Sequence, residues 1–383
     1  MDKTISISNL KTLEHRVKVK GIIVKSLFAF IILFQLLFAS ISCSSDEQEI
    51  GKQLSKPSNF IQNYIDQNSE AKYIEQISPL DSVSATQNIA QLLRTSDLTP
   101  AYAFRGVAIV DDYAYATSRE GGYLLVYKLD NIRKANTYLG NVYQVSYLAI
   151  NGAATTIARM GNYLYVGGDC ISIINISNRS SPQLVKTINY SAYRSIKVIG
   201  NYLISSDSKS YIFDITNPAA PMCLSTFGDH TDATIYKTTL YAGEWISTKG
   251  VRVYDISDIH NMREIKFIPL DGDVYHVDIM NNNLFAVAEQ FSFLKSFLYS
   301  FSLVNPADPS LNDSLQFNGL GRAFGITNAF CVIGSGTAAY VVDITDPKSM
   351  SVISTINDLG GTQDGFPFDI SISRNLVSLL NFM

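Results

Sequence analysis

The chain has little of the chemistry by which enzymes are most readily recognised. Its 383 residues include one tryptophan, four cysteines and four histidines. It contains no Cys-x-x-Cys pair, no Gly-x-Ser-x-Gly motif, no glycine-rich phosphate loop and no EF-hand loop. Cys170, Cys223 and Cys331 lie in strand-like apolar runs, which predicts buried free thiols, with one disulfide as the alternative. We expect neither a metal nor a cofactor.

Positive charge is scarce as well. The first 42 residues hold six of the 30 lysines and arginines but only two of the 34 acidic residues, so the remainder has 24 basic and 32 acidic residues, a net charge of −8. Nucleic acids and anionic surfaces attract proteins of the opposite sign. The charge balance therefore argues against both as partners.

Residues 1–42 are typical of an export signal. Six basic residues precede an apolar run of 15 residues, Leu27–Ile41, interrupted only by Gln35 and Ser40. That run is shorter than the roughly 20 residues that span a membrane. Its end, Ser40-Ile41-Ser42-Cys43, resembles a bacterial lipoprotein signal, which implies that Cys43 becomes the lipidated first residue of the mature chain. An ordinary signal peptide or an anchor helix is the alternative.

The residues after Cys43 indicate where the protein is displayed. Ser44–Glu49 is a serine-led acidic stretch that resembles the surface-export signal of Bacteroidota lipoproteins. Residues 43–71 are polar and predict a tether. We expect an outer-membrane lipoprotein at the cell surface, with the periplasm-facing leaflet as the alternative. Its contact with the membrane would be through the lipid anchor only.

One phrase recurs six times: a short apolar strand that ends in Ile or Leu, a further residue that is usually polar, and then Asn or Asp. The copies are Val126–Asn131, Ile173–Asn178, Ile212–Asn217, Val253–Asp258, the degenerate Ser300–Asn305, and Val341–Asp346. Their closing residues are 47, 39, 41, 47 and 41 positions apart. This period is typical of the four-stranded blade of a β-propeller.

The phrase also identifies a family. Asp214–Pro221 and Val341–Pro347, together with Tyr254–Asp258, resemble the LVIVD repeat. The resemblance extends over about residues 104–383. It implies an all-β propeller of four-stranded antiparallel blades, often found in secreted or surface lipoproteins, and it brings no shared catalytic motif.

The aspartates of the phrase have a structural interpretation. Asp214, Asp255 and Asp343 each precede an Ile, a Ser or Thr, and a further Asn or Asp. Asn and Asp side chains cap the backbone of tight turns. We therefore interpret these residues as turn formers and not as catalysts.

The C-terminal end predicts only part of a blade. Asp369–Ser373 and Leu376–Leu380 are two strand-like segments. Tyr73–Leu80 resembles the last strand of the fourth repeat, Glu264–Leu270, so we predict that it completes a seventh blade of a propeller domain at residues 72–383. The alternative is a chain truncated at its C-terminus. Helical spacing at Gln87–Arg94 predicts a short helix.

One face of such a propeller is the candidate site. Loops that enter the innermost strands share a face with the turns between second and third strands. Aligning the repeats places five charged residues at those entrances: Arg105, Arg194, Asp232, His276 and Arg322. Trp245 lies in a second-to-third turn of the same face. We predict that these six residues bind a ligand; a polar channel without a ligand is the alternative.

Two functions of different classes remain. The first is a non-enzymatic binding or scaffold module for a glycan, a peptide or a neighbouring envelope protein. The second is a hydrolase or lyase acting on extracellular carbohydrate, with His276, Asp232 or Asp278 as acid–base groups. A cluster of carboxylates and histidine with a raised carboxyl pKa would favour the enzyme, and an aromatic or apolar rim without one would favour binding.

Overall fold

The computed structural model describes residues 2–6, 91–94, 104–119, 121–130, 141–245, 248–336, 338–356, 367–373 and 376–381. All of them belong to one compact unit, Met1–Ser8 with Ser58–Met383. Cys43, the tether and Tyr73–Leu80 lie outside the described residues, and their assignments stay predictions. Among the described residues, no helix has the length and apolar character needed to cross a membrane.

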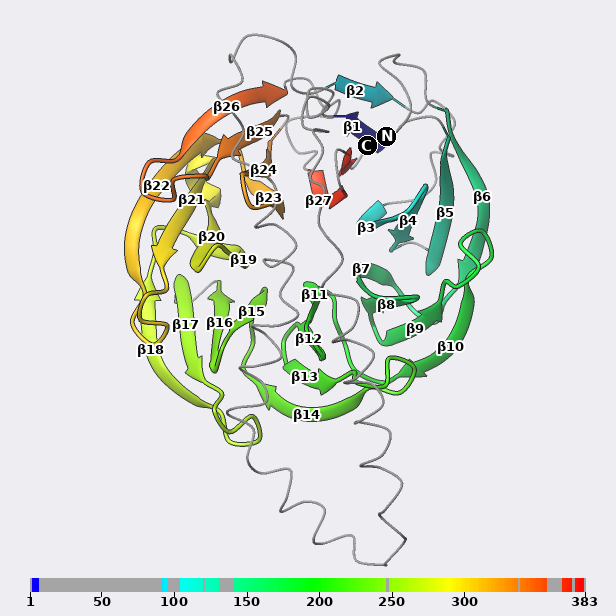
Figure 1. Cartoon of the computed structure of the whole chain (residues 1–383), viewed down its shortest axis with the longest axis horizontal. Coiled ribbons are helices and arrows are strands. Elements are labelled where there is room, and N and C mark those ends of the chain that lie inside the picture. Colours follow the sequence, from blue (N-terminus) through cyan, green and yellow to red (C-terminus); the bar gives the residue numbers. More distant parts are fainter. Residues whose placement is uncertain are drawn as a thin grey trace, which may run out of the picture. The chain divides into compact units, whose positions relative to one another are not determined.

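Six four-stranded antiparallel sheets, each built from strands consecutive in the chain, are the blades of a β-propeller (Figure 1). Blades one to three consist of β3 (Phe104–Val110), β4 (Tyr113–Ser118), β5 (Tyr123–Asp130), β6 (Asn141–Ala149), β7 (Ala154–Met160), β8 (Tyr163–Gly168), β9 (Ile171–Asn175), β10 (Gln183–Ile188), β11 (Ser195–Ile199), β12 (Tyr202–Ser206), β13 (Ser210–Asp214) and β14 (Met222–Phe227). Blades four to six consist of β15 (Ala233–Tyr236), β16 (Thr239–Glu244), β17 (Gly250–Asp255), β18 (Arg263–Pro269), β19 (Asp273–Met280), β20 (Asn283–Gln290), β21 (Lys295–Ser302), β22 (Ser310–Asn318), β23 (Gly321–Ile326), β24 (Phe330–Ser335), β25 (Ala338–Asp343) and β26 (Ser351–Ile356). The short 3-10 turn η2 (Phe291–Phe293) joins β20 to β21.

A further sheet has a mixed origin. It pairs β27 (Pro367–Ser373) and β28 (Leu376–Asn381) with β1 (Asp2–Ser6) and β2 (Gln91–Arg94), in the order β2-β1-β28-β27. β27 contacts both β23 and β3, the innermost strands of blades six and one, and so closes the circle of innermost strands (Figure 1).

The prediction of seven blades is therefore corrected to six. The mixed sheet does not repeat the consecutive pattern, because its third strand, β1, comes from residues that the sequence predicts to be a signal peptide. The helix predicted at Gln87–Arg94 is also wrong where the structure describes it, since Gln91–Arg94 is strand. The segment forms a strand because it pairs with β1, and this tertiary pairing outweighs the weak helical periodicity of its sequence.

The repeated phrase folds as the turn between third and fourth strands. In blade three, Asp214 Oδ1 accepts a hydrogen bond of 2.7 Å from the backbone N–H of Thr216, and Asn217 Oδ1 accepts one from the N–H of Ala219. Asp255 and Asp343 accept equivalent bonds of 2.9 Å in blades four and six. The prediction that these aspartates form turns is confirmed.

Apolar side chains pack between neighbouring blades, and three tyrosines of the second strands add a polar link. Tyr115, Tyr165 and Tyr241 are fully buried at their positions in β4, β8 and β16. Each hydroxyl donates a hydrogen bond to a backbone carbonyl in the turn between third and fourth strands of the next blade. The acceptors are the carbonyls of Arg179 for Tyr115 (2.8 Å), Pro218 for Tyr165 (2.9 Å) and Pro306 for Tyr241 (2.8 Å). These bonds join blade one to two, two to three, and four to five.

The outermost strand of every one of the six blades carries a β-bulge. In each case one residue of the fourth strand is left without a register partner on the third: Val145, Val185, Leu224, Ile265, Asn312 and Ile353. A bulge bends the strand and interrupts its ladder of hydrogen-bonding groups.

The three cysteines after Cys43 are free, as predicted. Cys331 is buried in the core, but Cys170 is only partly buried and Cys223 is exposed. The prediction of burial is thus wrong for Cys223, which lies on the outermost strand β14 where one side of the strand meets solvent.

Candidate functional site

A cavity of about 760 Å³ lies between the innermost strands. Its walls come from β3, β7, β11, β19, β23 and β27, with side chains from the adjoining loops and turns. Five of the six predicted site residues line it: Arg105, Arg194, Trp245, His276 and Arg322. The structure therefore brings together residues of blades one, three, four, five and six, as the alignment of repeats predicted.

Several of the lining residues are placed by β-bulges. The first-to-second strand pairing skips a residue at Thr155 in β7, Tyr275 in β19 and Arg322 in β23, and skips two residues, Arg105 and Gly106, in β3. An extra residue changes the direction of the side chain relative to the regular alternation of a strand. Because the bulge recurs at the entrance of these strands, residues from separate blades converge on one cavity.

The charged side chains that line the cavity are mostly cationic, although Arg194, Lys197 and Arg322 are paired with carboxylates outside the lining. Six cationic side chains line the cavity: Arg105, Arg119, Arg159, Arg194, Lys197 and Arg322. Asp278 is the single carboxylate among the described residues of the lining. This contrasts with the acidic balance of the chain as a whole, which has 34 acidic and 30 basic residues.

Asp232, the remaining predicted residue, lies behind the wall and not in it. Its side chain is fully buried, and four donors saturate its carboxylate. Ser195 Oγ (2.6 Å) and Lys197 Nζ (2.7 Å) come from blade three, the N–H of Val277 (2.9 Å) comes from blade five, and the fourth is the N–H of Ala233 (2.9 Å). Asp232 thus ties three blades together and is out of reach of a ligand in the cavity.

Lys197 and His276 form the wall next to Asp232. Burial alone would lower the pKa of Lys197, but the carboxylates of Asp232 and Asp278 hold that pKa above its usual value. Burial lowers the pKa of His276, and this outweighs the opposite influence of Asp232. Lys197 is therefore a permanent cation and His276 a neutral ring at neutral pH.

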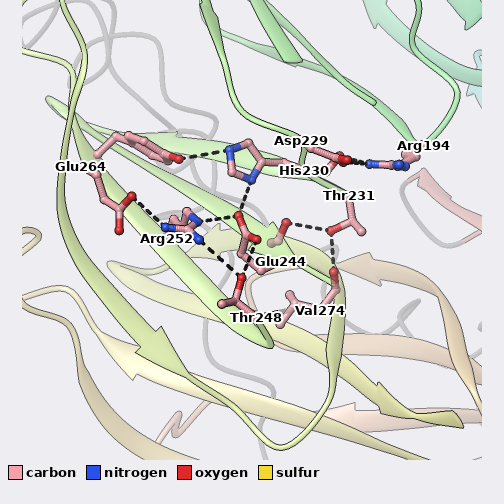
Figure 2. A network of polar contacts seen from close by, with 11 residues as sticks. Arg194, Asp229, His230, Thr231, Glu244, Thr248, Arg252, Glu264 and Val274 are labelled. Atoms are coloured by element: carbon pink, nitrogen blue, oxygen red, sulfur yellow. Dashed lines mark hydrogen bonds and ion pairs between the residues drawn. The ribbon is translucent and has the colours of Figure 1, made fainter. Parts of the chain in front are cut away.

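A polar network holds Arg194 in position (Figure 2). Its guanidinium is paired with Asp229. It also stacks over the indole of Trp245, with Cζ 4.4 Å from the ring centroid. The neighbouring His230 is almost fully buried, and its Nδ1 lies 2.9 Å from Glu244 Oε1.

The same network continues to the outer strand of blade four. Arg252 Nε lies 2.7 Å from Glu244 Oε1, and Arg252 Nη1 lies 2.8 Å from Glu264 Oε2. Burial alone would raise the pKa of Glu244, but its hydrogen bonds with His230 and Arg252 lower that pKa overall. The charged network is thus fixed from the cavity mouth to the edge of the sheet.

Arg322 is fixed in a similar way on the opposite side. It pairs with Glu289, with Nη2 3.1 Å from Oε1, and it lies over the ring of Tyr275 at 5.3 Å. Glu289 is only 1% exposed, and burial raises its pKa even though Arg322 favours the charged form. The carboxylate therefore supports Arg322 from behind and does not enter the cavity lining.

Sequence reasoning missed several lining residues, among them Arg119, Tyr193 and Lys197. Arg119 is recognisable as the residue after β4, in the same second-to-third turn position that gave Trp245 in blade four. Lys197 has no comparable sequence feature. It lies inside a strand, where only the alternation of side chains indicates whether it faces the cavity. Among the residues that the structure describes, no group of three His, Cys, Asp or Glu side chains is placed to hold a metal ion.

Comparisons with known proteins identify the repeat and the fold. The LVIVD repeat family matches residues 151–190 and 192–228, which are blades two and three with the loops before them. No curated protein matches the chain.

Solved structures of similar architecture are distant in sequence. A putative 6-phosphogluconolactonase from Bacteroides fragilis is 11% identical, with a TM-score of 0.56 over 70% of this chain and 87% of that one. Chaetomium thermophilum Sqt1 bound to the N-terminus of ribosomal protein L10 is 10% identical, with a TM-score of 0.53 over 76% and 89%. The periplasmic gluconolactonase PpgL of Pseudomonas aeruginosa is 14% identical, with a TM-score of 0.51 over 66% and 84%. At these identities the likeness shows the propeller fold alone.

Proposed function

Because this chain carries LVIVD repeats on a β-propeller, we propose that it is a non-enzymatic binding module of the cell envelope whose cavity holds an anionic ligand. The observation that carries the proposal is the lining of the cavity, with six cationic side chains against one carboxylate. Clefts lined by charge of one sign concentrate ligands of the opposite sign, and more so where the walls have a low dielectric constant.

The size and preorganisation of the cavity support a ligand of small to medium size. Its volume of about 760 Å³ lies within the range of roughly 300–1,000 Å³ for small-molecule sites. Arg194 and Arg322 are held by Asp229 and Glu289, so little side-chain freedom is lost when a ligand binds. Arg119 is exposed and makes no ion pair with a described residue, which leaves its charge available.

The location of the protein is part of the proposal. The apolar run before Cys43 and the acidic residues after it support a lipoprotein of the outer membrane, facing the cell surface or, as the alternative, the periplasm. Replacing Cys43 with alanine tests the anchor. We expect the protein to move from the membrane fraction to the soluble fraction. Retention of the alanine variant in the membrane fraction would refute lipid attachment at that residue.

The enzymatic alternative has less support from the geometry. Asp232 is buried and saturated by four donors, and His276 donates through Nε2 to the carbonyl of Arg322 at 2.9 Å. A raised carboxyl pKa occurs at Glu289, but that carboxylate is shielded behind Arg322. No second carboxylate faces Asp278 within the described lining, as paired acid–base chemistry would require.

Trp245 gives a direct test of anion binding, because it is the single tryptophan of the chain and lines the cavity. Its emission is followed while the full chain is titrated with glucuronate, poly-glutamate or neutral glucose at low and high salt. We expect an anion to change the emission, with weaker binding at high salt, and glucose to have no effect.

A matched pair of variants locates the bound charge. Arg119→Gln removes a cation from the cavity, and Arg263→Gln removes one from the outer strand β18, where its side chain is 75% exposed. We expect only the first to weaken binding. Equal effects, or no binding of any anion by emission and calorimetry, would overturn the proposed function.

A further inference from the structure

The cavity offers different hydrogen-bonding groups at its mouth and in its depth. The mouth presents guanidinium donors, among them Arg105, Arg194 and Arg322 at the entrances of their strands. Asp278 lies three residues beyond Tyr275 on β19, which corresponds to about 10 Å further along the strand. Guanidinium donors are therefore most numerous at one end of the cavity, with Arg159 near the inner end of β7, and the carboxylate of Asp278 lies well inside the cavity.

Asp278 retains acceptor capacity. One of its oxygens, Oδ1, accepts the backbone N–H of Ile279 at 2.8 Å, and Oδ2 lies 3.7 Å from Lys197 Nζ. A carboxylate can accept about four hydrogen bonds, and this side chain is 35% exposed. Asp278 can thus accept further bonds from a ligand in the cavity.

His276, two residues before Asp278 on β19 and so nearer the mouth, adds a second acceptor. A carbonyl can only accept, so the contact of 2.9 Å between Nε2 and the carbonyl of Arg322 requires the proton on Nε2. In the neutral ring, Nδ1 is then an acceptor. Asp232 Oδ2, 4.0 Å from Nδ1, is also an acceptor and gives Nδ1 no proton.

These groups select among anions. An aliphatic acid would cover Asp278 with hydrocarbon and leave its carboxylate without water or donors, which is costly. An ammonium group would meet Lys197 beside Asp278, only 3.7 Å away, and be repelled. A hydroxyl group fits both, since it donates to Asp278 and accepts from Lys197.

We propose that the ligand is a sugar acid or a short acidic saccharide, with its carboxylate at the arginine mouth and its ring hydroxyls at Asp278, His276 and Lys197. This inference rests on the proposed function and names its ligand class. Asp278 is accordingly a specificity-determining residue, and Trp245 offers an aromatic surface at the mouth for the sugar ring.

Three probes of similar size separate charge from hydroxyl recognition. Glucuronate carries both features, cyclohexanecarboxylate has the ring and the charge but no hydroxyl group, and glucose has the hydroxyl groups without the charge. Binding to the full chain is measured by Trp245 emission and by calorimetry, which also detects binding that leaves the emission unchanged. We expect glucuronate to bind about tenfold more tightly than cyclohexanecarboxylate, and glucose not to bind.

Asp278→Asn tests the residue itself, with Asp308→Asn as the control, since Asp308 is 67% exposed on a distant turn. Asp278→Asn is expected to weaken glucuronate binding about tenfold and to leave cyclohexanecarboxylate unchanged, with thermal melts confirming that both variants fold. Equal binding of the two acids, or an Asp278→Asn variant that binds glucuronate normally, would overturn this inference while the proposed function stands. If only poly-glutamate bound, the saccharide proposal would be wrong and the ligand would be an acidic peptide. If none of the anions bound, both proposals would be refuted.

Discussion

The hydroxyl of Tyr165 in blade two donates a 2.9 Å hydrogen bond to the carbonyl of Pro218 in blade three. Pro218 lies in the turn between third and fourth strands that the repeated phrase builds, so the most repetitive part of the sequence also supplies the acceptor that joins blades. Tyr115 and Tyr241 make the same connection elsewhere in the ring.

Replacing Tyr165 with phenylalanine should therefore destabilise the propeller without creating a cavity. The change removes the hydroxyl and leaves the carbonyl of Pro218 without this donor, which costs about 1–2 kcal/mol. Urea denaturation measures the loss in the free energy of unfolding. Tyr147→Phe serves as the control, because Tyr147 is 64% exposed and should change stability by less than about 0.5 kcal/mol. Equal stability of the two variants would show that the inter-blade bond contributes nothing.

Replacing Asp232 with alanine should be the most damaging single change near the cavity. It leaves Lys197 in the wall without its closest carboxylate and removes the acceptor of Val277 in blade five. Breaking a buried pair in this way costs about 3–5 kcal/mol, whereas Asp308→Ala, which breaks an exposed pair with Lys266, should cost at most about 1 kcal/mol. Adding Lys197→Met to Asp232→Ala should restore part of the loss. A double variant no more stable than the single one would contradict the role of the uncompensated charge.

Acidification should destabilise the protein through His276. Burial lowers the pKa of His276 in the folded state below its unfolded value of about 6.5. A group with a lowered pKa contributes full stability above the unfolded value, and that contribution is lost as the pH falls toward the folded value. Between pH 7.5 and 5.5 the wild-type chain should thus lose more unfolding free energy than His276→Gln. Identical losses would assign the acid sensitivity to other groups, since Asp232, Lys197 and Asp278 all face this ring.

Two glycines of blade two allow two causes of destabilisation to be compared: a steric clash with neighbouring atoms, and an unfavourable backbone conformation. A Cβ at Gly168 would lie 1.8 Å from the carbonyl oxygen of Ala153, so Gly168→Ala must move backbone and should cost about 1–3 kcal/mol. Gly161 has open space around it but a φ of +56°, so Gly161→Ala should cost about 1 kcal/mol from conformation alone. Denaturation of the two variants side by side measures both, and a Gly168→Ala variant as stable as wild type would contradict the close approach.

The sequence is sufficient for the blades because their signals are local and repeated. The third strands of blades two, three, four and six end in the same Asx turn. Asp214 shows why, since its side chain accepts a hydrogen bond from the backbone two residues later in the same turn. The end of the ring is a different problem. β28 pairs with β1 from the start of the chain, and no local pattern specifies which distant segment fills an open edge.

The sequence predicts where the candidate site lies, but not which of its charged side chains face the cavity. Loop entrances gave Arg105, Arg194 and Arg322 because each lies where a repeat begins. Whether a charged residue there faces the cavity depends on the bulge next to it and on the blades beside it. Asp232 occupies an entrance like the others, yet donors from blades three and five enclose it. Such contacts between blades are absent from any single repeat.

The bulges of the six outermost strands affect how copies of the protein can associate at high local concentration. A protein held by the lipid anchor proposed at Cys43 would diffuse in two dimensions, where neighbouring copies meet edge to edge more often than in solution. Strands such as β10 and β26 expose apolar side chains at those edges, including Val185 and Ile353 at the bulges themselves. Because each bulge interrupts the row of N–H and C=O groups, a neighbouring copy finds no continuous template for another strand. With the anchor proposed at Cys43, copies could therefore be crowded on a membrane without pairing into a continuous intermolecular sheet.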